Sequence, residues 1–129
     1  MDKKYTVFLV DDDRFLLDMY SIKFNKSGHT AKVAGSSSDA LKMLREGFVP
    51  DVMVLDIIMP GMDGLELLET IRKEKLIPDT TIIMLTNQSQ STEIDRATKL
   101  GVAGYIVKAS TIPSEVVHEV VEIVSKRKG

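Results

Sequence analysis

The segment Val52-Met53-Val54-Leu55-Asp56-Ile57-Ile58-Met59-Pro60-Gly61 decides the fold of this chain. Four consecutive apolar residues, followed by an acid and then by a turn that contains proline and glycine, predict a strand over Val52–Asp56. Because the run shows no polar alternation, we expect both faces of this strand to be buried, as in parallel sheets that are covered by helices. Asp56 would then stand at the carboxyl end of a central strand.

Other apolar runs of the chain also end in polar side chains. These side chains are the carboxylates of Asp11, Asp12 and Asp13, the hydroxyl of Thr86 and the amine of Lys108. In an open parallel sheet the carboxyl ends of the strands meet at one edge, and ligands bind at that edge. Carboxylates, a hydroxyl and an ammonium gathered there indicate a site for a divalent metal ion and a phosphoryl group.

Strand patterns and helix patterns alternate five times along the chain. This alternation predicts an α/β fold, a doubly wound five-stranded parallel sheet with helices on both faces. The expected strands are Tyr5–Val10, Thr30–Ala34, Val52–Asp56, Thr81–Thr86 and Gly104–Val107. The expected helices are Arg14–Ser27 with a cap at Asp12 or Asp13, a helix capped by Ser37 or Ser38 that ends at Glu46, Leu65–Lys73, a helix capped by Ser91 that ends at Leu100, and a last helix from Pro113 to about Lys126.

The size and composition are those of an ordinary globular protein. The chain has 129 residues, of which 43% are hydrophobic, and its net charge of −2 gives no field that attracts nucleic acid. It contains no cysteine, so disulfides are excluded. No stretch approaches the ~20 apolar residues of a membrane span, and the first residues lack the apolar core of a signal peptide. We therefore expect a cytoplasmic protein that makes no membrane contact, with residues 1–129 forming one domain and leaving no room for an output domain.

Asp56 is the candidate nucleophile. An aspartate with an ordinary pKa of about 3.9 is ionised at neutral pH, and a carboxylate can attack phosphorus to form an aspartyl phosphate. Neighbouring carboxylates repel one another unless a cation lies between them, and Mg²⁺ prefers hard oxygen ligands. We therefore expect Asp12, Asp56 and the carbonyl of Ile58 to bind Mg²⁺ directly, and Asp11 to bind it through water.

The other polar strand ends suit the same chemistry. Lys108 is expected to contact Asp56 and then the phosphoryl oxygens as a flexible cationic donor, and Thr86 to offer its hydroxyl to another phosphoryl oxygen. Phosphoryl transfer depends on positioning and charge neutralisation, which these groups supply. Taken singly, each of these residues also has an ordinary structural explanation. Only their expected position together at one edge of the sheet favours a catalytic role. His29 and His118 are expected at the surface.

The chain resembles, over essentially its whole length, the receiver domain of two-component response regulators, and among these the stand-alone receivers of the chemotaxis type. The resemblance implies a flavodoxin-like sheet in the order 2-1-3-4-5, Mg²⁺ as cofactor, and phosphorylation of Asp56 by a histidine kinase or phosphotransfer protein. It also implies a switch in which Thr86 moves toward the phosphoryl group and Tyr105 turns inward. The matching segments are Phe8-Leu9-Val10-Asp11-Asp12-Asp13, Val54-Leu55-Asp56-Ile57-Ile58-Met59-Pro60-Gly61-Met62-Asp63-Gly64, Met84-Leu85-Thr86 and Gly104-Tyr105-Ile106-Val107-Lys108.

This resemblance favours a phosphoacceptor switch over an enzyme with turnover. Such a switch catalyses only its own phosphorylation and dephosphorylation, and it binds a downstream target protein as a monomer or weak transient dimer, without direct contact to nucleic acid. A phosphatase of the haloacid-dehalogenase type is an alternative, because Asp11 and Asp13 satisfy the Asp-x-Asp pattern of that class. That class has longer chains and does not need Asp56. A receiver-like protein that only binds is a third interpretation, which the intact acids disfavour.

Two departures from the receiver pattern bear on kinetics. Ile58 is apolar where the family often has a polar residue, and Ile58 and Gln88 flank the expected path of the hydrolytic water, which predicts a long-lived aspartyl phosphate. Ala109 stands where proline usually follows the site lysine, Lys108. Because a cis bond costs about 2.5–4 kcal/mol before a residue other than proline, we expect the Lys108–Ala109 bond to be trans.

Overall fold

Five parallel strands form one sheet in the order β2-β1-β3-β4-β5. The structure, a computed structural model, describes residues 3–86, 91–108 and 111–128. The order and the parallel pairing confirm the predicted doubly wound sheet, with the polar β2 at one edge as its composition favours. The strands are β1 (Thr6–Val10), β2 (Thr30–Ala34), β3 (Val52–Asp56), β4 (Thr81–Thr86) and β5 (Gly104–Val107).

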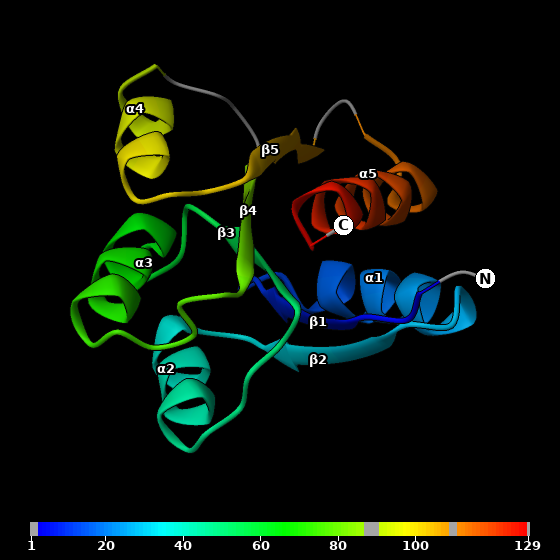
Figure 1. Ribbon diagram of the computed structural model, residues 1–129, viewed down its shortest axis with the longest axis horizontal. Coiled ribbons are helices and arrows are strands. Elements are labelled where there is room, and N and C mark those ends of the chain that lie inside the picture. The colour runs from blue at the N-terminus through cyan, green and yellow to red at the C-terminus, as the bar shows by residue number, and fades with distance from the viewer. Residues whose placement is uncertain (1–2, 87–90, 109–110, 129) are drawn as a thin grey trace.

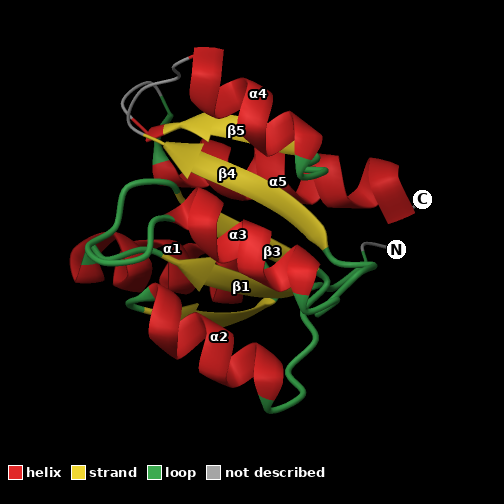
Figure 2. Cartoon of the chain, turned by 90° about the vertical axis from the view of Figure 1, so that its left-hand side faces the viewer, coloured by secondary structure: helices red, strands yellow, loops and turns green. Residues whose placement is uncertain are grey.

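Helices cover both faces of the sheet (Figures 1 and 2). Helices α1 and α5 pack on one face and α2, α3 and α4 on the other, so the chain has two apolar layers, one on each side of the strands. Within the described residues, no helix is both long and apolar enough to cross a membrane. The helices are α1 (Arg14–Lys26), α2 (Ser37–Arg45), α3 (Gly64–Lys73), α4 (Ser91–Lys99) and α5 (Pro113–Lys128).

The central strands are buried as their sequences predict. Every residue of β3 and of β4 is buried, which accounts for the uninterrupted apolar runs. The register pairs Val10 with Leu55 and Asp56 with Leu85, so that neighbouring strands end at the same level. This alignment is what brings the polar residues after the strands to one edge.

The helix starts differ from the sequence prediction at three places. Helix α2 is capped by Ser36, whose hydroxyl accepts from the Asp39 backbone N–H, because Ser37 is buried and its hydroxyl donates to the Met62 carbonyl instead. Helix α3 begins one residue early, at Gly64. Helix α4 has Ser91 as its first residue rather than its cap, so the capping position falls outside the described residues. For α1 the alternative of Asp13 as the cap is confirmed.

His29 is buried, and the prediction that it lies at the surface was wrong. Its side chain is 8% exposed because its Nδ1 accepts a hydrogen bond from the Tyr5 backbone N–H and its ring stacks on that of Tyr5. The ring of Phe24 packs edge-on against it from α1. His118, in contrast, is exposed on α5, as expected.

Candidate functional site

The predicted site residues do meet at the carboxyl edge of the sheet. Asp56 ends the central strand β3, Asp11 and Asp12 follow β1, and Lys108 follows β5. Asp11 and Asp56 are buried, at 2% and 4% exposed, whereas Asp12 is exposed. Two buried carboxylates beside the exposed Asp12 form a site that a small ion can enter from solvent.

Three carboxylates are close enough to hold one cation. An oxygen from each of Asp11, Asp12 and Asp56 lies within 4.8 Å of the others. Oδ1 of Asp11 accepts a hydrogen bond of 2.9 Å from the Asp13 backbone N–H, and its buried Oδ2 lies 2.6 Å from Nζ of Lys108. Three carboxylates this close repel one another unless positive charge lies between them, and their oxygens are ligands that a hard divalent cation prefers.

Lys108 supplies the positive charge of the site. Its Nζ lies 2.6 Å from Oδ2 of Asp11 and 3.5 Å from Oδ1 of Asp56, with only 9% of the side chain exposed. The expected contact with Asp56 is therefore present, but the shorter ion pair is with Asp11. Burial acts to lower the pKa of Lys108, but hydrogen bonding to Asp11 and the charge of Asp56 outweigh it and raise this pKa. The lysine stays charged between the two carboxylates.

Asp56 has a strongly altered acidity. Burial, followed by the charge of Asp11, raises the pKa of Asp56 from 3.8 to about 7, although Lys108 acts against the shift. The expectation of an ordinary pKa near 4 was therefore wrong for the metal-free chain, because the sequence does not reveal how little water reaches this carboxyl. A nucleophile that is partly protonated at neutral pH needs an additional positive charge to be fully ionised.

The loop after Asp56 is fixed by contacts of its backbone. The Gly64 N–H donates to the Ile57 carbonyl at 2.7 Å, and a Cβ at position 64 would meet the Asp56 carbonyl oxygen at 2.1 Å. Asp63 and Glu66 form a reciprocal capping box that starts α3 at this point. Gly64 was not predicted as a site residue, although the aspartate–glycine pair before a helical pattern is a signal for such a tight turn.

Ile58 points outward beside the site. Its side chain is 66% exposed, while the flanking Ile57 and Met59 are buried. An exposed isoleucine two residues after the candidate nucleophile covers part of the approach with apolar surface. The other two predictions for this region concern Gln88 and the Lys108–Ala109 bond, and both lie outside the described residues.

Thr86 and Tyr105 lie on neighbouring strands at the β5 side of the site. Thr86 ends β4 and is buried, where it pairs with Val107 in the ladder. Tyr105 is half-buried, and its hydroxyl donates to the Ile94 carbonyl of α4 at 2.6 Å. Tyr105 therefore connects β5 to α4, and the proposed coupling to Thr86 stays a prediction.

These features together define a class of protein. A buried aspartate at the end of β3, two acids after β1 and a lysine after β5, on a sheet of order 2-1-3-4-5, are the arrangement expected of a receiver domain. The family model for the response regulator receiver domain matches residues 7–121, and the chain belongs to this family. This membership decides against the haloacid-dehalogenase alternative.

Individual relatives agree with this assignment. The chain is 33% identical over 103 residues to the transcriptional regulatory protein AfsQ1 of Streptomyces coelicolor. The aligned residues cover 80% of this chain and 44% of that protein. It is 33% identical over 102 residues to the Regulator of RpoS of Escherichia coli, covering 79% of this chain and 29% of that protein. The chain thus spans less than half the length of these curated relatives.

Solved structures show the same architecture. The receiver domain of the Francisella response regulator 1452 has a TM-score of 0.82 and 29% identity, covering 97% of this chain and 99% of that one. A CheY-like receiver domain protein from Methanospirillum hungatei has a TM-score of 0.86 at 24% identity, with 98% of both chains covered, and supports the fold alone. The fold and the two-component family are thereby established.

Proposed function

We propose that Asp56 accepts a phosphoryl group from a histidine kinase or phosphotransfer protein, with Mg²⁺, and that this changes a surface that binds a downstream protein. We propose also that residues 1–129 make up one receiver domain. The observation that carries the proposal is the cluster of buried Asp56 and Asp11 with exposed Asp12, held around the ammonium of Lys108. Membership in the receiver family supports the direction of transfer.

The transfer itself is a substitution at phosphorus. An ionised carboxylate oxygen of Asp56 forms the new O–P bond while the P–N bond of a phosphohistidine breaks, and the imidazole leaves with the electron pair of that bond. Only the ionised carboxyl is nucleophilic, so the raised pKa of Asp56 makes the reaction at neutral pH depend on a bound cation, which would favour the ionised form. The protein supplies positions and charges, and needs no covalent step other than the one at Asp56.

Mg²⁺ fits the carboxylates of this chain. The residues that would hold it are Asp12 and Asp56 directly, Asp11 through water, and the carbonyl of Ile58, as the sequence predicts. When bound, the ion would neutralise part of the carboxylate charge and supply positive charge to the transferred phosphoryl group. The closeness of the three carboxylates and the exposure of Asp12 to solvent support this assignment.

Lys108 and Thr86 have separate proposed roles. Lys108 is already close to both buried carboxylates, so a short movement of its flexible stem would bring its ammonium to a phosphoryl oxygen on Asp56. Thr86, at the end of the next strand, would offer its hydroxyl to another phosphoryl oxygen. Tyr105 would then transmit the change to the surface of α4, β5 and α5 where the target protein binds.

Exposed apolar residues support a protein as the phosphoryl donor. Phe15, Ile58 and Ile112 are 73%, 66% and 60% exposed, and they follow the ends of β1, β3 and β5. They therefore lie near the edge that carries Asp56, where a protein surface would cover them. A domain of this kind acts as a switch rather than as an enzyme with turnover. Binding without direct contact to nucleic acid, a monomeric or weakly dimeric state and the cytoplasmic location stay predictions.

The direct test is phosphorylation with a small donor. The purified chain is incubated with phosphoramidate and Mg²⁺, and intact mass is recorded before and after treatment with hydroxylamine, which cleaves acyl phosphates. We expect one labile phosphoryl group, absent in Asp56→Asn and in EDTA. Asp18→Asn is the matched control, because Asp18 is an exposed aspartate of α1 outside the site. An undiminished adduct in Asp56→Asn would rule out the assignment.

A second measurement separates a switch from a phosphatase. Steady hydrolysis of p-nitrophenyl phosphate is followed at protein concentrations that give full phosphorylation with phosphoramidate. We expect no multiple turnover, because the proposed product is the modified Asp56 itself. Continuous release of p-nitrophenol that depends on Asp56 would show an enzyme instead.

A further inference from the structure

The loop between β3 and α3 is held by few polar contacts. We call residues 58–62 the β3–α3 loop. Among the described residues, its hydrogen bonding is limited to one bond, in which the Met62 carbonyl accepts from the Ser37 hydroxyl at 2.7 Å. Its apolar anchors are Met59, which is buried, and Met62, which packs on the layer that α2 and α3 share. Because the loop has so few contacts, the loss of any one of them should loosen it.

Ser37 reaches this loop from the start of α2. It is the first residue of that helix and is 3% exposed. Its hydroxyl is not needed to cap α2, because Ser36 accepts from the Asp39 backbone N–H in that role. Helices α2 and α3 lie side by side on the same face of the sheet (Figure 2). The buried hydroxyl of Ser37 therefore ties the start of one helix to the loop that leads into the other.

The base of the loop is fixed without Ser37. The Gly64 backbone N–H donates to the Ile57 carbonyl at 2.7 Å, and the Ile57 side chain is buried. Ile58 comes next, and its side chain is 66% exposed, so it gives the loop no apolar anchor. The course of the backbone past Ile58 therefore depends on contacts further along the loop, among them the bond to Ser37. The Ile58 carbonyl, which is a proposed ligand of Mg²⁺, belongs to this part of the chain.

We propose that Ser37 is a positioning residue for the metal site, because its bond to Met62 holds the loop in the conformation in which the Ile58 carbonyl can bind Mg²⁺. This role rests on the Mg²⁺ site proposed above and adds to it a residue that lies outside the acid cluster. An ion that binds one loop conformation loses apparent affinity in proportion to the population of that conformation. Loss of one hydrogen bond changes such a population by about three- to tenfold.

Mg²⁺ affinity measures this role directly. Magnesium chloride is titrated by calorimetry into the unphosphorylated wild type and Ser37→Ala, without a phosphoryl donor. We expect Ser37→Ala to raise the Kd for Mg²⁺ by about three- to tenfold, although every carboxylate of the site is still in place. A merely structural role would lower the stability of the folded chain and leave the affinity of the folded protein unchanged.

The order of the loop is measured without metal. In EDTA, ¹⁵N relaxation gives backbone order parameters for the amides of Met59, Gly61 and Met62. We expect these values to fall in Ser37→Ala to those of flexible segments, below about 0.6, while the values of α2 and α3 stay as in the wild type. Because no Mg²⁺ is present, this measurement tests the contact between Ser37 and the loop by itself.

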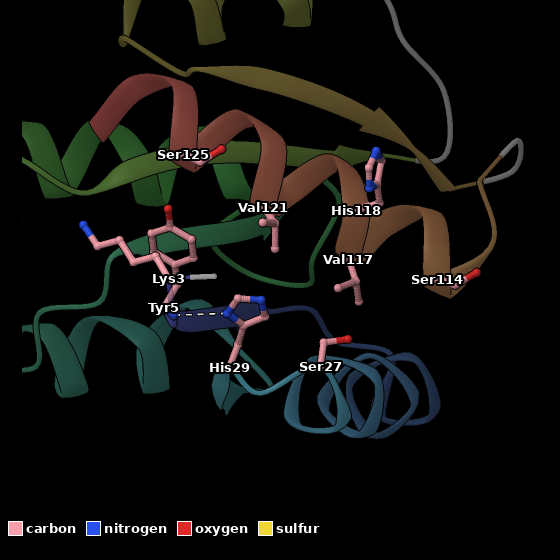
Figure 3. Close-up of a pocket in the computed structure, with 9 residues that line it drawn as sticks. All are labelled: Lys3, Tyr5, Ser27, His29, Ser114, Val117, His118, Val121 and Ser125. Atoms are coloured by element: carbon pink, nitrogen blue, oxygen red, sulfur yellow. Dashed lines mark hydrogen bonds between the residues drawn. The ribbon is translucent and has the colours of Figure 1, made fainter. Parts of the chain in front are cut away.

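Other serines of the chain supply matched controls. Ser36→Ala removes the cap of the same helix, and Ser38→Ala changes an exposed neighbour. Ser27→Ala removes a bond of the same kind, because the Ser27 hydroxyl donates to the Lys23 carbonyl at 3.0 Å. Ser27 follows α1 and lines a groove between α1 and α5, the helices that cover the opposite face of the sheet (Figure 3). All three controls should keep the Kd for Mg²⁺ within about twofold of the wild type.

Ser37→Thr tests the hydroxyl itself. Threonine keeps the O–H donor, so this variant should restore both the Mg²⁺ affinity and the order of the loop. Should the alanine or the threonine variant fail to fold by circular dichroism, Ser37→Cys takes its place. The S–H group is a weak donor, and the cysteine variant should therefore give values between those of the wild type and of a loop without the bond.

Several results would overturn the role of Ser37. They are an equal Mg²⁺ affinity of Ser37→Ala and the wild type, unchanged order parameters of the loop, a loss of affinity that Ser36→Ala shares, and a folded Ser37→Thr that behaves like Ser37→Ala. If the wild type binds Mg²⁺ and Asp12→Asn binds it more weakly, such a result refutes the role of Ser37 alone. Absence of Mg²⁺ binding by the wild type would refute the proposed metal site, and the role of Ser37 with it.

Discussion

Replacing Asp56 with asparagine should stabilise the metal-free protein at alkaline pH. Burial of the Asp56 carboxyl and, second, the negative charge of Asp11 raise the pKa of Asp56 from 3.8 to about 7. This difference corresponds to about 4 kcal/mol of destabilisation once the carboxyl is ionised, at about 1.36 kcal/mol per pH unit. Asparagine has nearly the same shape and no charge, and Lys108 keeps its ion pair with Asp11 at 2.6 Å in the variant.

The sign of the pH dependence follows from the direction of the shift. Because the folded chain raises the pKa of Asp56, folding favours the protonated carboxyl, and this contribution is complete below about pH 3.8. It is lost as the pH rises through about 7, where the folded chain releases its proton. Asp56→Asn should therefore exceed the wild type in stability by about 2–4 kcal/mol at pH 8, and the advantage should fall to about 1–2 kcal/mol at pH 5 and vanish below about pH 4.

Urea unfolding followed by circular dichroism measures this difference. Both proteins are unfolded in EDTA at pH 5 and pH 8, with Asp18→Asn as a control for the loss of an exposed carboxylate. Mg²⁺ is then added at pH 8, where it should stabilise the wild type and not Asp56→Asn, since only a ligand that prefers the folded state raises stability. An asparagine variant that is less stable than the wild type at pH 8, or a difference independent of pH, would contradict the raised pKa of Asp56.

Three further outcomes are expected at the site. Asp12→Asn should lower Mg²⁺ affinity by about tenfold or more, because it removes a charge and a ligand together, and unchanged affinity in a titration would exclude the ligand role. Thr86→Ala should still accept a phosphoryl group but lose the NMR shift changes near Tyr105, and their persistence would disprove the coupling. Ile58→Asn should lose phosphate faster than the wild type by mass spectrometry, because asparagine can orient the hydrolytic water, and a slower loss would contradict this.

The sheet was predictable because burial on both faces leaves a simple pattern in the sequence. The apolar runs of β3 and β4 predicted where these strands begin and end. The polar residues that follow such runs predicted the edge of the sheet at which the site lies. The strand order came instead from the resemblance to receivers. The first residues of helices were less predictable. Ser36, Ser37 and Ser38 are chemically equal, and only the burial of Ser37 selects Ser36 as the cap of α2.

The electrostatics of the site could not be predicted from the chain alone. The pKa of Asp56 depends on desolvation, which is a property of the packed structure rather than of the neighbouring letters. Lys108 is nearer to Asp11, at 2.6 Å, than to Asp56, at 3.5 Å, and this difference at the end of a flexible side chain leaves no sign in the sequence. His29 was assigned to the surface because a lone histidine after a glycine gives no sign of the ring of Tyr5 that covers it.

The contact between Gly64 and the Asp56 carbonyl has a consequence for how such a domain diversifies. A methyl group at position 64 would overlap backbone that cannot move without displacing the acceptor, since the nearest atoms belong to Asp56 and Ile57. Saturation mutagenesis should therefore find position 64 nearly intolerant, while exposed Ile58 and Phe15 accept many residues. Substitutions that change partner choice or phosphate lifetime can then accumulate at exposed positions such as Ile58 and Phe15. Asp56 meanwhile keeps its place through a backbone contact that involves no side chain.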